Sequence, residues 1–308
     1  MQAVRRVEPG RFAVAGVELR DPTDGEIVVD VAFASVNPFD LQVLRGDIAP
    51  RAPWPLTLGA EASGCVDGVP VQVSGSGIGS ILDGTFAPRL IAPQGAVRPL
   101  PHGADLEGAA TVGVAGKTAW RVVHQLARVG ADDVVLVLGG AGGVGLFAAQ
   151  LARSTGAEVL VHTGSPAKAA GVEALGLQPV VADTRSALVG HVAAHPPTVV
   201  LDPLGGDWMA TLLPALAPRA RVVVYGTLAG RAARIDLRDL YSKGISVLGT
   251  SGATTPADES AQALAGALGA VVAGDVHVPR EVLGLPDAGE AFDLLQARSV
   301  VGKLLLKP

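Results

Sequence analysis

The sequence predicts an α/β protein in which a doubly wound parallel sheet is joined to a mainly β domain. At 308 residues the chain is long enough for about two domains. From residue 131 onward, short apolar runs alternate with helical segments, which is the pattern of a parallel sheet covered on both faces. Before residue 117, strand-like segments are separated by loops rich in proline and glycine, which indicates a mainly β domain.

Six apolar runs are the predicted strands of the parallel sheet, and a helix fits between most neighbouring pairs. These runs are 134–138, 158–162, 179–182, 198–201, 220–224 and 245–248. The sheet and its helices place one domain at residues 117–272. The tail holds a helical pattern at 288–297 and a strand at 302–307, which the sheet does not need. We therefore assign residues 273–308 to the first domain, which otherwise covers residues 1–116.

Composition excludes several classes of function. The formal charge is -5, from 24 Lys and Arg against 29 Asp and Glu, and no run of five basic residues occurs. Neither nucleic acid nor an anionic membrane surface is therefore an expected partner. No apolar run approaches the roughly 18 to 20 residues of a membrane-spanning helix, and residues 1–20 show no secretory signal, so we expect a cytoplasmic protein. The single cysteine, Cys65, forbids an intrachain disulfide and a multi-thiolate zinc cage.

A glycine-rich turn at residues 140–145 closes the first predicted strand and opens a helix at 144–153. Gly140 is expected to permit the tight turn, Gly142 to let the backbone approach a pyrophosphate, and Gly145 to let the helix pack on the sheet. The positive end of the helix would then meet the phosphates of a dinucleotide. The alternative is a glycine-rich turn with no ligand.

The end of the second predicted strand bears on which dinucleotide binds. An acidic residue there would hold the ribose 2′-hydroxyl of NAD, but the strand ends in His162, Thr163, Gly164 and Ser165. Lys168 follows one helical turn later, and this set is better suited to a 2′-phosphate. The sequence therefore favours NADPH over NADH. The alternative is that Lys168 is only a solvated helix residue.

Six short motifs in order resemble those of the medium-chain dehydrogenase/reductase superfamily, in particular its zinc-free quinone oxidoreductase branch, the group of zeta-crystallin. The resemblance runs over most of the chain. The motifs are SVNPFD at 35–40 followed by RG at 45–46, LGAEASG at 58–64, GKTAW at 116–120, GGAGGVG at 139–145, VYG at 224–226 and VGKLLL at 301–306.

This resemblance implies a GroES-like catalytic domain at 1–116, completed by 273–308, and a Rossmann NADP(H)-binding domain at 117–272, with the active cleft between them. It places Asn37 and Thr118 near the nicotinamide or substrate. Both have alternatives, because Asn37 could form a turn before Pro38 and Thr118 could be a helix N-cap. The residues implied to bind the cofactor are Gly142, Gly143 and Val144 at the pyrophosphate, with Gly140 in the same turn, then Gly164, Ser165 and Lys168 at the 2′-phosphate, and Tyr225, Gly226 and Thr227 along the cofactor channel.

The resemblance also implies that no catalytic zinc binds. Zinc-dependent members have a Cys where this chain has Asn37 and a His where it has Ala60, next to the retained Glu61. Two ligands are therefore missing. His191 and His195 have a metal-like spacing, but Pro196 follows and two ligands do not make a site, so we interpret them as a frayed helix end.

Without a metal, the expected activity is hydride transfer from NADPH to a quinone or another conjugated carbonyl acceptor, with orientation supplying most of the catalysis. One alternative is a reductase of C=C bonds in an enone or enoyl substrate of a biosynthetic pathway. A second is a non-catalytic NADPH-binding sensor, because the family's tyrosine is missing near residues 46–48. Asp183 stands where related reductases present a Tyr to the 2′-phosphate. The family further implies a homodimer, paired through the strand at 245–249.

Overall fold

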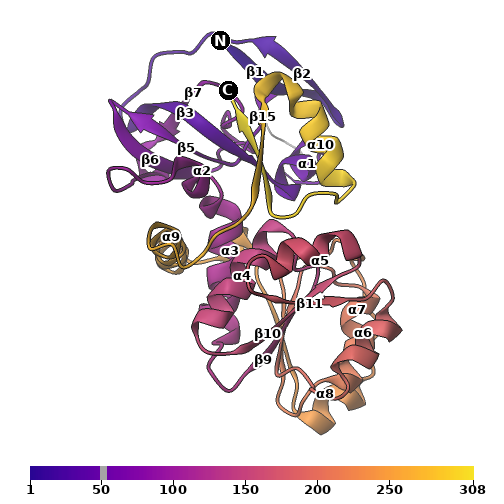
Figure 1. The fold of residues 1–308 in the computed structure, drawn as a ribbon. Helices are drawn as coiled ribbons and strands as arrows, with labels where there is room; N and C mark the ends of the chain where they lie inside the picture. Colours follow the sequence, from indigo (N-terminus) through magenta and orange to yellow (C-terminus); the bar gives the residue numbers. More distant parts are fainter. Residues whose placement is uncertain (49–53) are drawn as a thin grey trace. The chain divides into compact units, whose positions relative to one another are not determined.

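The computed structural model describes residues 1–48 and 54–308. The chain forms two compact units (Figure 1). Unit 1 contains Met1–Val114 and Pro279–Pro308, and unit 2 contains Ala115–Val278. No helix among the described residues is both long and apolar enough to cross a membrane.

Unit 1 is built on β-sheets. A sheet of seven strands has the order β15-β16-β3-β5-β6-β8, with β7 also paired to β3, and a smaller sheet has the order β2-β1-β4. The strands are β1 Gln2–Glu8, β2 Arg11–Gly16, β3 Glu26–Val36, β4 Leu56–Thr57, β5 Glu61–Val66, β6 Val69–Ser74, β7 Arg89–Pro93, β8 Val97–Pro99, β15 Arg280–Gly284 and β16 Lys303–Lys307. The helices are α1 Pro38–Arg45, α2 Leu106–Ala109 and α10 Ala288–Gln296, with 3₁₀ turns at Gln94–Ala96 and Leu285–Asp287.

The C-terminal strand β16 belongs to unit 1 through its pairing. It runs antiparallel to β3, with Leu305 opposite Ser35 and Leu304 opposite Val36. Its Leu304 and Leu306 are buried in a core that also contains Phe86 and Phe292. This register brings the start of β16 to the end of β3, where α1 begins.

Unit 2 contains a six-stranded parallel sheet with the order β11-β10-β9-β12-β13-β14. Numbered along the sheet's own chain, this is the 3-2-1-4-5-6 order of a doubly wound dinucleotide-binding fold, so the predicted fold class is confirmed. The strands are β9 Val134–Val137, β10 Glu158–Thr163, β11 Gln178–Val181, β12 Val199–Asp202, β13 Arg221–Val224 and β14 Ser246–Gly249. Most of their side chains are buried because helices cover both faces.

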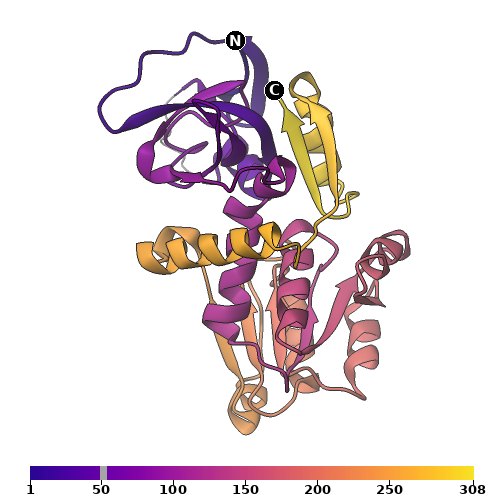
Figure 2. The ribbon, with the colours of Figure 1, turned by 60° about the vertical axis from the view of Figure 1, so that its left-hand side comes forward.

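Seven α-helices belong to unit 2, and α9 is seen along its length in Figure 2 (orange). They are α3 Lys117–Trp120, α4 Gly143–Ser154, α5 Pro166–Glu173, α6 Arg185–Val192, α7 Asp207–Leu212, α8 Leu237–Lys243 and α9 Ala257–Val272, with 3₁₀ turns at Leu213–Ala215 and Gly252–Thr254. Helix α3 lies inside a longer helical stretch whose flanks, Val112–Gly116 and Arg121–Ala127, are π-helical. A Cβ at Gly266 of α9 would lie 2.3 Å from the Trp120 ring, so these two helices pack closely.

Candidate functional site

The glycine-rich turn connects β9 to α4 as predicted, but its glycines have structural roles that differ from the predicted ones. Gly139, with a φ of 55°, adopts the left-handed conformation that the tight turn needs, so the assignment of this role to Gly140 was wrong. A Cβ at Gly140 would instead lie 2.5 Å from Cγ1 of Val161 on β10. A Cβ at Gly145 would lie 2.5 Å from Cα of Gly140. Glycine at 140 and 145 therefore lets α4 pack directly on the sheet.

Gly142 differs from its neighbours because the space beside it is open. Among the described residues, a Cβ there would have only the Gly139 carbonyl oxygen within 4 Å, at 3.8 Å. Gly142 is the N-cap of α4 and no side chain caps the helix. The first amide groups of Gly143 and Val144 therefore have no partner within the helix, and the helix dipole adds positive potential there. The residues present fit the diphosphate of a dinucleotide.

The ends of β10 and β11 lie side by side, since the Ala182 amide donates to the Thr163 carbonyl at 3.0 Å. Gly164 is exposed, Ser165 is the N-cap of α5, and Lys168 is half-buried in the first turn of that helix. Asp183 follows β11 and is exposed. The group expected to meet a 2′-phosphate is thus gathered at one corner of the sheet, with a carboxylate on the adjoining loop.

The ends of β12 and β13 carry buried polar groups. Oδ1 of Asp202 accepts hydrogen bonds from the amides of Leu204 at 2.7 Å and Gly205 at 2.9 Å, and burial raises the pKa of its carboxyl. The Tyr225 hydroxyl is buried with no hydrogen-bond partner among the described residues, and burial raises its pKa. A Cβ at Gly226 would lie 2.6 Å from the Pro203 carbonyl oxygen. Gly226 therefore packs tightly against the end of β12, whereas Thr227 is exposed.

Thr118 lies within a helix, not at its start. It is the second residue of α3, and the chain is already helical from Val112. The N-cap alternative for Thr118 is therefore wrong, and its side chain is half-buried. π-Helical turns such as those on either side of it are frequent at functional sites.

Asn37 is the N-cap of α1 and its side chain is almost fully buried. Its amide nitrogen donates to the Ser35 carbonyl at 3.1 Å and to Oε1 of Glu61 at 2.9 Å, while its Oδ1 accepts from Lys303 Nζ at 2.5 Å. Both donors of the amide are therefore used inside unit 1. The Asn37 side chain is therefore fixed by hydrogen bonds within unit 1.

Lys303 was not among the predicted site residues, yet it stands at the centre of this cluster. Its ammonium lies 3.3 Å from Oε1 of Glu61, and both side chains are buried. It also donates to the Val36 carbonyl at 3.3 Å. The other oxygen of Glu61, Oε2, accepts from the Val114 amide at 2.8 Å. A protein cation therefore already neutralises the retained glutamate.

Asp40 adds a second buried carboxyl to the cluster. It is fully buried, and its Oδ2 accepts from the backbone amide of Asn37 at 2.7 Å. Burial is the largest cause that raises the pKa of Asp40, to about 7. One ammonium facing two carboxyls balances only one negative charge, which is consistent with a proton held on Asp40 near neutral pH.

The described residues contain no group of three or more His, Cys, Asp or Glu arranged to hold a metal. His191 lies in the last turn of α6, and His195 lies beyond the end of that helix. These two histidines therefore do not share a helical face, which supports the interpretation as a helix end.

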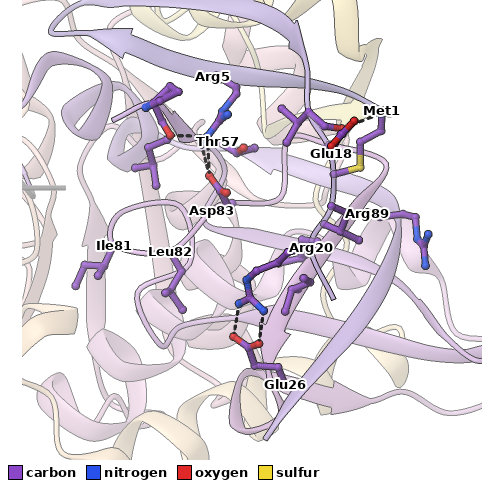
Figure 3. Close-up of a pocket in the computed structure, with 18 residues that line it drawn as sticks. Met1, Arg5, Glu18, Arg20, Glu26, Thr57, Ile81, Leu82, Asp83 and Arg89 are labelled. Atoms are coloured by element: carbon purple, nitrogen blue, oxygen red, sulfur yellow. Dashed lines mark hydrogen bonds and ion pairs between the residues drawn. The ribbon is translucent and has the colours of Figure 1, made fainter. Parts of the chain in front are cut away.

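Unit 1 also contains a cavity of about 440 Å³ that includes none of the predicted site residues (Figure 3). Its wall carries the ion pair of Arg20 with Glu26 at 2.6 Å and that of Arg5 with Asp83 at 3.5 Å. Two ion pairs thus lie on this wall.

Comparison with known proteins places this architecture in a family. A family described as an alcohol dehydrogenase GroES-like domain matches residues 23–102, and one described as a zinc-binding dehydrogenase matches residues 143–269. The chain is 31% identical over 234 residues to quinone oxidoreductase-like protein 2 of Mus musculus, covering 73% of this chain and 67% of that protein. It is 28% identical over 278 residues to a quinone oxidoreductase of Pseudomonas aeruginosa, covering 86% of each. The chain belongs to the medium-chain dehydrogenase/reductase superfamily, and the predicted resemblance is confirmed.

Solved structures agree in fold and differ in cofactor. An NAD-dependent alcohol dehydrogenase matches with a TM-score of 0.88 at 26% identity, over 100% of both chains. The quinone oxidoreductase of Thermus thermophilus, solved also in complex with NADPH, matches with a TM-score of 0.86 at 26% identity, over 100% of both chains. The fold is therefore shared with proteins that use either nicotinamide cofactor.

Proposed function

We propose that this oxidoreductase is an NADPH-dependent reductase that passes hydride to a quinone or another conjugated carbonyl acceptor without a metal. The observation that carries the proposal is the open space at Gly142, beside the uncapped start of α4 and next to the closed contacts of Gly140 and Gly145. Relatives named quinone oxidoreductases support the acceptor class.

NADPH, when bound, would supply the hydride at C4 of its nicotinamide ring. The residues of this chain would bind and orient it. The amides of Gly143 and Val144 would donate to the diphosphate, and Gly164, Ser165 and Lys168 would meet the 2′-phosphate.

The Lys303 ammonium supports chemistry without a metal. It lies between Asn37, where zinc-dependent relatives have a Cys, and Glu61, which follows Ala60, where they have a His. A divalent cation beside Glu61 would have to displace this buried ammonium or bear its repulsion. Acceptors that take hydride without a Lewis acid, such as quinones and enones, suit this arrangement best.

A steady-state assay tests the proposal. NADPH oxidation should be measured with a quinone, an enone and a simple ketone, before and after dialysis against a chelator. We expect turnover with the quinone, unchanged by the chelator. Turnover confined to the enone would favour the C=C reductase, whereas saturable NADPH binding without turnover on any acceptor would favour the sensor. Loss of activity on chelation, restored by zinc, would refute the metal-free reaction.

A homodimer in the cytoplasm remains part of the proposal. Strand β14 ends the six-stranded sheet of unit 2, and Val247 on it is exposed. An unpaired sheet edge of this kind can pair with the same strand of a second copy. Sedimentation of the purified protein would test the dimer, and a small-molecule substrate is the only other partner we propose.

A further inference from the structure

His162 lies at the carboxyl end of β10, beside the glycine-rich turn, and its imidazole is almost fully buried. Its Nδ1 accepts a hydrogen bond from the Gly139 amide at 3.3 Å. Its Nε2 lies 2.9 Å from the Ala182 carbonyl oxygen. An amide can only donate and a carbonyl can only accept, so Nδ1 must carry the lone pair and Nε2 the proton. The ring is therefore neutral in this arrangement.

The contacts of the imidazole with Gly139 and Ala182 join the ends of β9, β10 and β11 at the point where the glycine-rich turn begins. The backbone carbonyl of His162 also accepts from the Gly140 amide at 2.8 Å, so a single residue holds the first two amides of the turn. Gly139 is the glycine whose left-handed conformation makes the turn. The ring centroid of Trp208 on α7 lies 4.9 Å from that of the imidazole and closes the other side.

The surroundings favour the neutral ring. Burial lowers the pKa of His162, and the hydrogen bond to Ala182 opposes this in part. Asp207 pairs with Arg185 at 3.0 Å and is exposed. Charged residues on β10, on the elements that pack against it and on α7 are Arg153, Glu158, Lys168, Glu173 and Asp207, and Asp183 follows the end of β11.

We infer that His162 is a positioning residue of the dinucleotide site: the lone pair of its neutral imidazole fixes Gly139, and so aims the amide end of α4 at the diphosphate. The inference rests on the proposed function. A protonated ring would turn an N–H toward the Gly139 amide and break the contact. Burial keeps the pKa of the ring below its ordinary value, so the contact is expected to persist through the neutral range and to be lost only where the buried ring takes up a proton.

Two amide substitutions separate the two ring contacts. In His162→Asn, the side-chain oxygen can stand where Nδ1 accepts from Gly139, whereas in His162→Gln the amide nitrogen can stand where Nε2 donates to Ala182. His191→Asn, at an exposed position on α6, is the matched control. The dissociation constant for NADPH is measured by calorimetric titration at pH 8 and pH 5.5, with unfolding followed by circular dichroism.

We expect His162→Asn and the control His191→Asn to bind NADPH within about threefold of wild type at both pH values. We expect His162→Gln to bind roughly tenfold more weakly at both pH values, because the turn loses its acceptor. Equal affinities of the two His162 variants, or a folded His162→Asn variant that binds NADPH at least about tenfold more weakly than wild type, would overturn the inference. The second result decides even if His162→Gln does not fold. Absence of NADPH and NADH binding by wild type would instead overturn the proposed function.

Discussion

Asp40→Asn tests the buried cluster of unit 1 through the pH dependence of stability. Asp40 has a pKa of about 7 in the folded protein against an ordinary value of 3.8, so folding favours its neutral form. The stabilisation that the neutral carboxyl gives to the folded state is fully present below its ordinary pKa of 3.8 and is lost as the pH rises through about 7. At one pKa unit per 1.36 kcal/mol, the ionised carboxylate lowers the free energy of unfolding by up to about 4 kcal/mol at pH 8.

Asparagine is neutral at every pH and keeps a side-chain oxygen that can accept the hydrogen bond from the backbone amide of Asn37. Urea unfolding of wild type and Asp40→Asn should therefore give similar stabilities near pH 4 and a more stable variant at pH 8, by up to about 4 kcal/mol. Asp47→Asn, at an exposed position after the same helix, is the control. The reasoning would be refuted if the difference in free energy of unfolding between Asp40→Asn and wild type stayed constant from pH 4 to pH 8. It would also be refuted if that difference shifted in favour of wild type as the pH rises.

Three further substitutions test the rest of the account. Gly142→Ala should fold normally, because among the described residues only the Gly139 carbonyl lies near its Cβ. It should bind NADPH at least about tenfold more weakly by calorimetry. Unchanged affinity would contradict a diphosphate site at the start of α4. Lys168→Ala should raise KM for NADPH much more than KM for NADH, and equal effects would refute its contact with the 2′-phosphate. Lys303→Met should cost about 3 to 5 kcal/mol in urea unfolding by leaving Glu61 unpaired, and the double variant with Glu61→Gln should recover part of the loss; no recovery would argue against the ion pair.

The parallel sheet could be predicted from sequence because each of its strands is a local apolar run with a helix after it. Strand β10, expected at 158–162, spans Glu158–Thr163, and the glycine-rich turn stands between β9 and α4. The local pattern also placed Gly142 just before the helix and Gly145 in its first turn, as the structure has them. It could not show that Gly139, not Gly140, carries the left-handed conformation, because both are glycines at the same turn.

The cluster around Asn37 could not be predicted in the same way. Lys303 meets Asn37 across 266 residues of sequence, through the pairing of β16 with β3, and nothing local to either residue signals the contact. The motif at 301–306 was used as a family signature, but its lysine was not assigned a role. Thr118 was misplaced as a possible N-cap because the preceding segment, with two glycines at 113 and 116, lacks a clear helical signal.

Calorimetric titration of the purified protein with NADPH and with NADH tests the central claim most directly, because the whole account depends on a dinucleotide diphosphate at the start of α4. We predict saturable binding of both, tighter for NADPH, with affinity lost in Gly142→Ala. Absence of binding by either nucleotide, or binding that Gly142→Ala leaves unchanged, would contradict it.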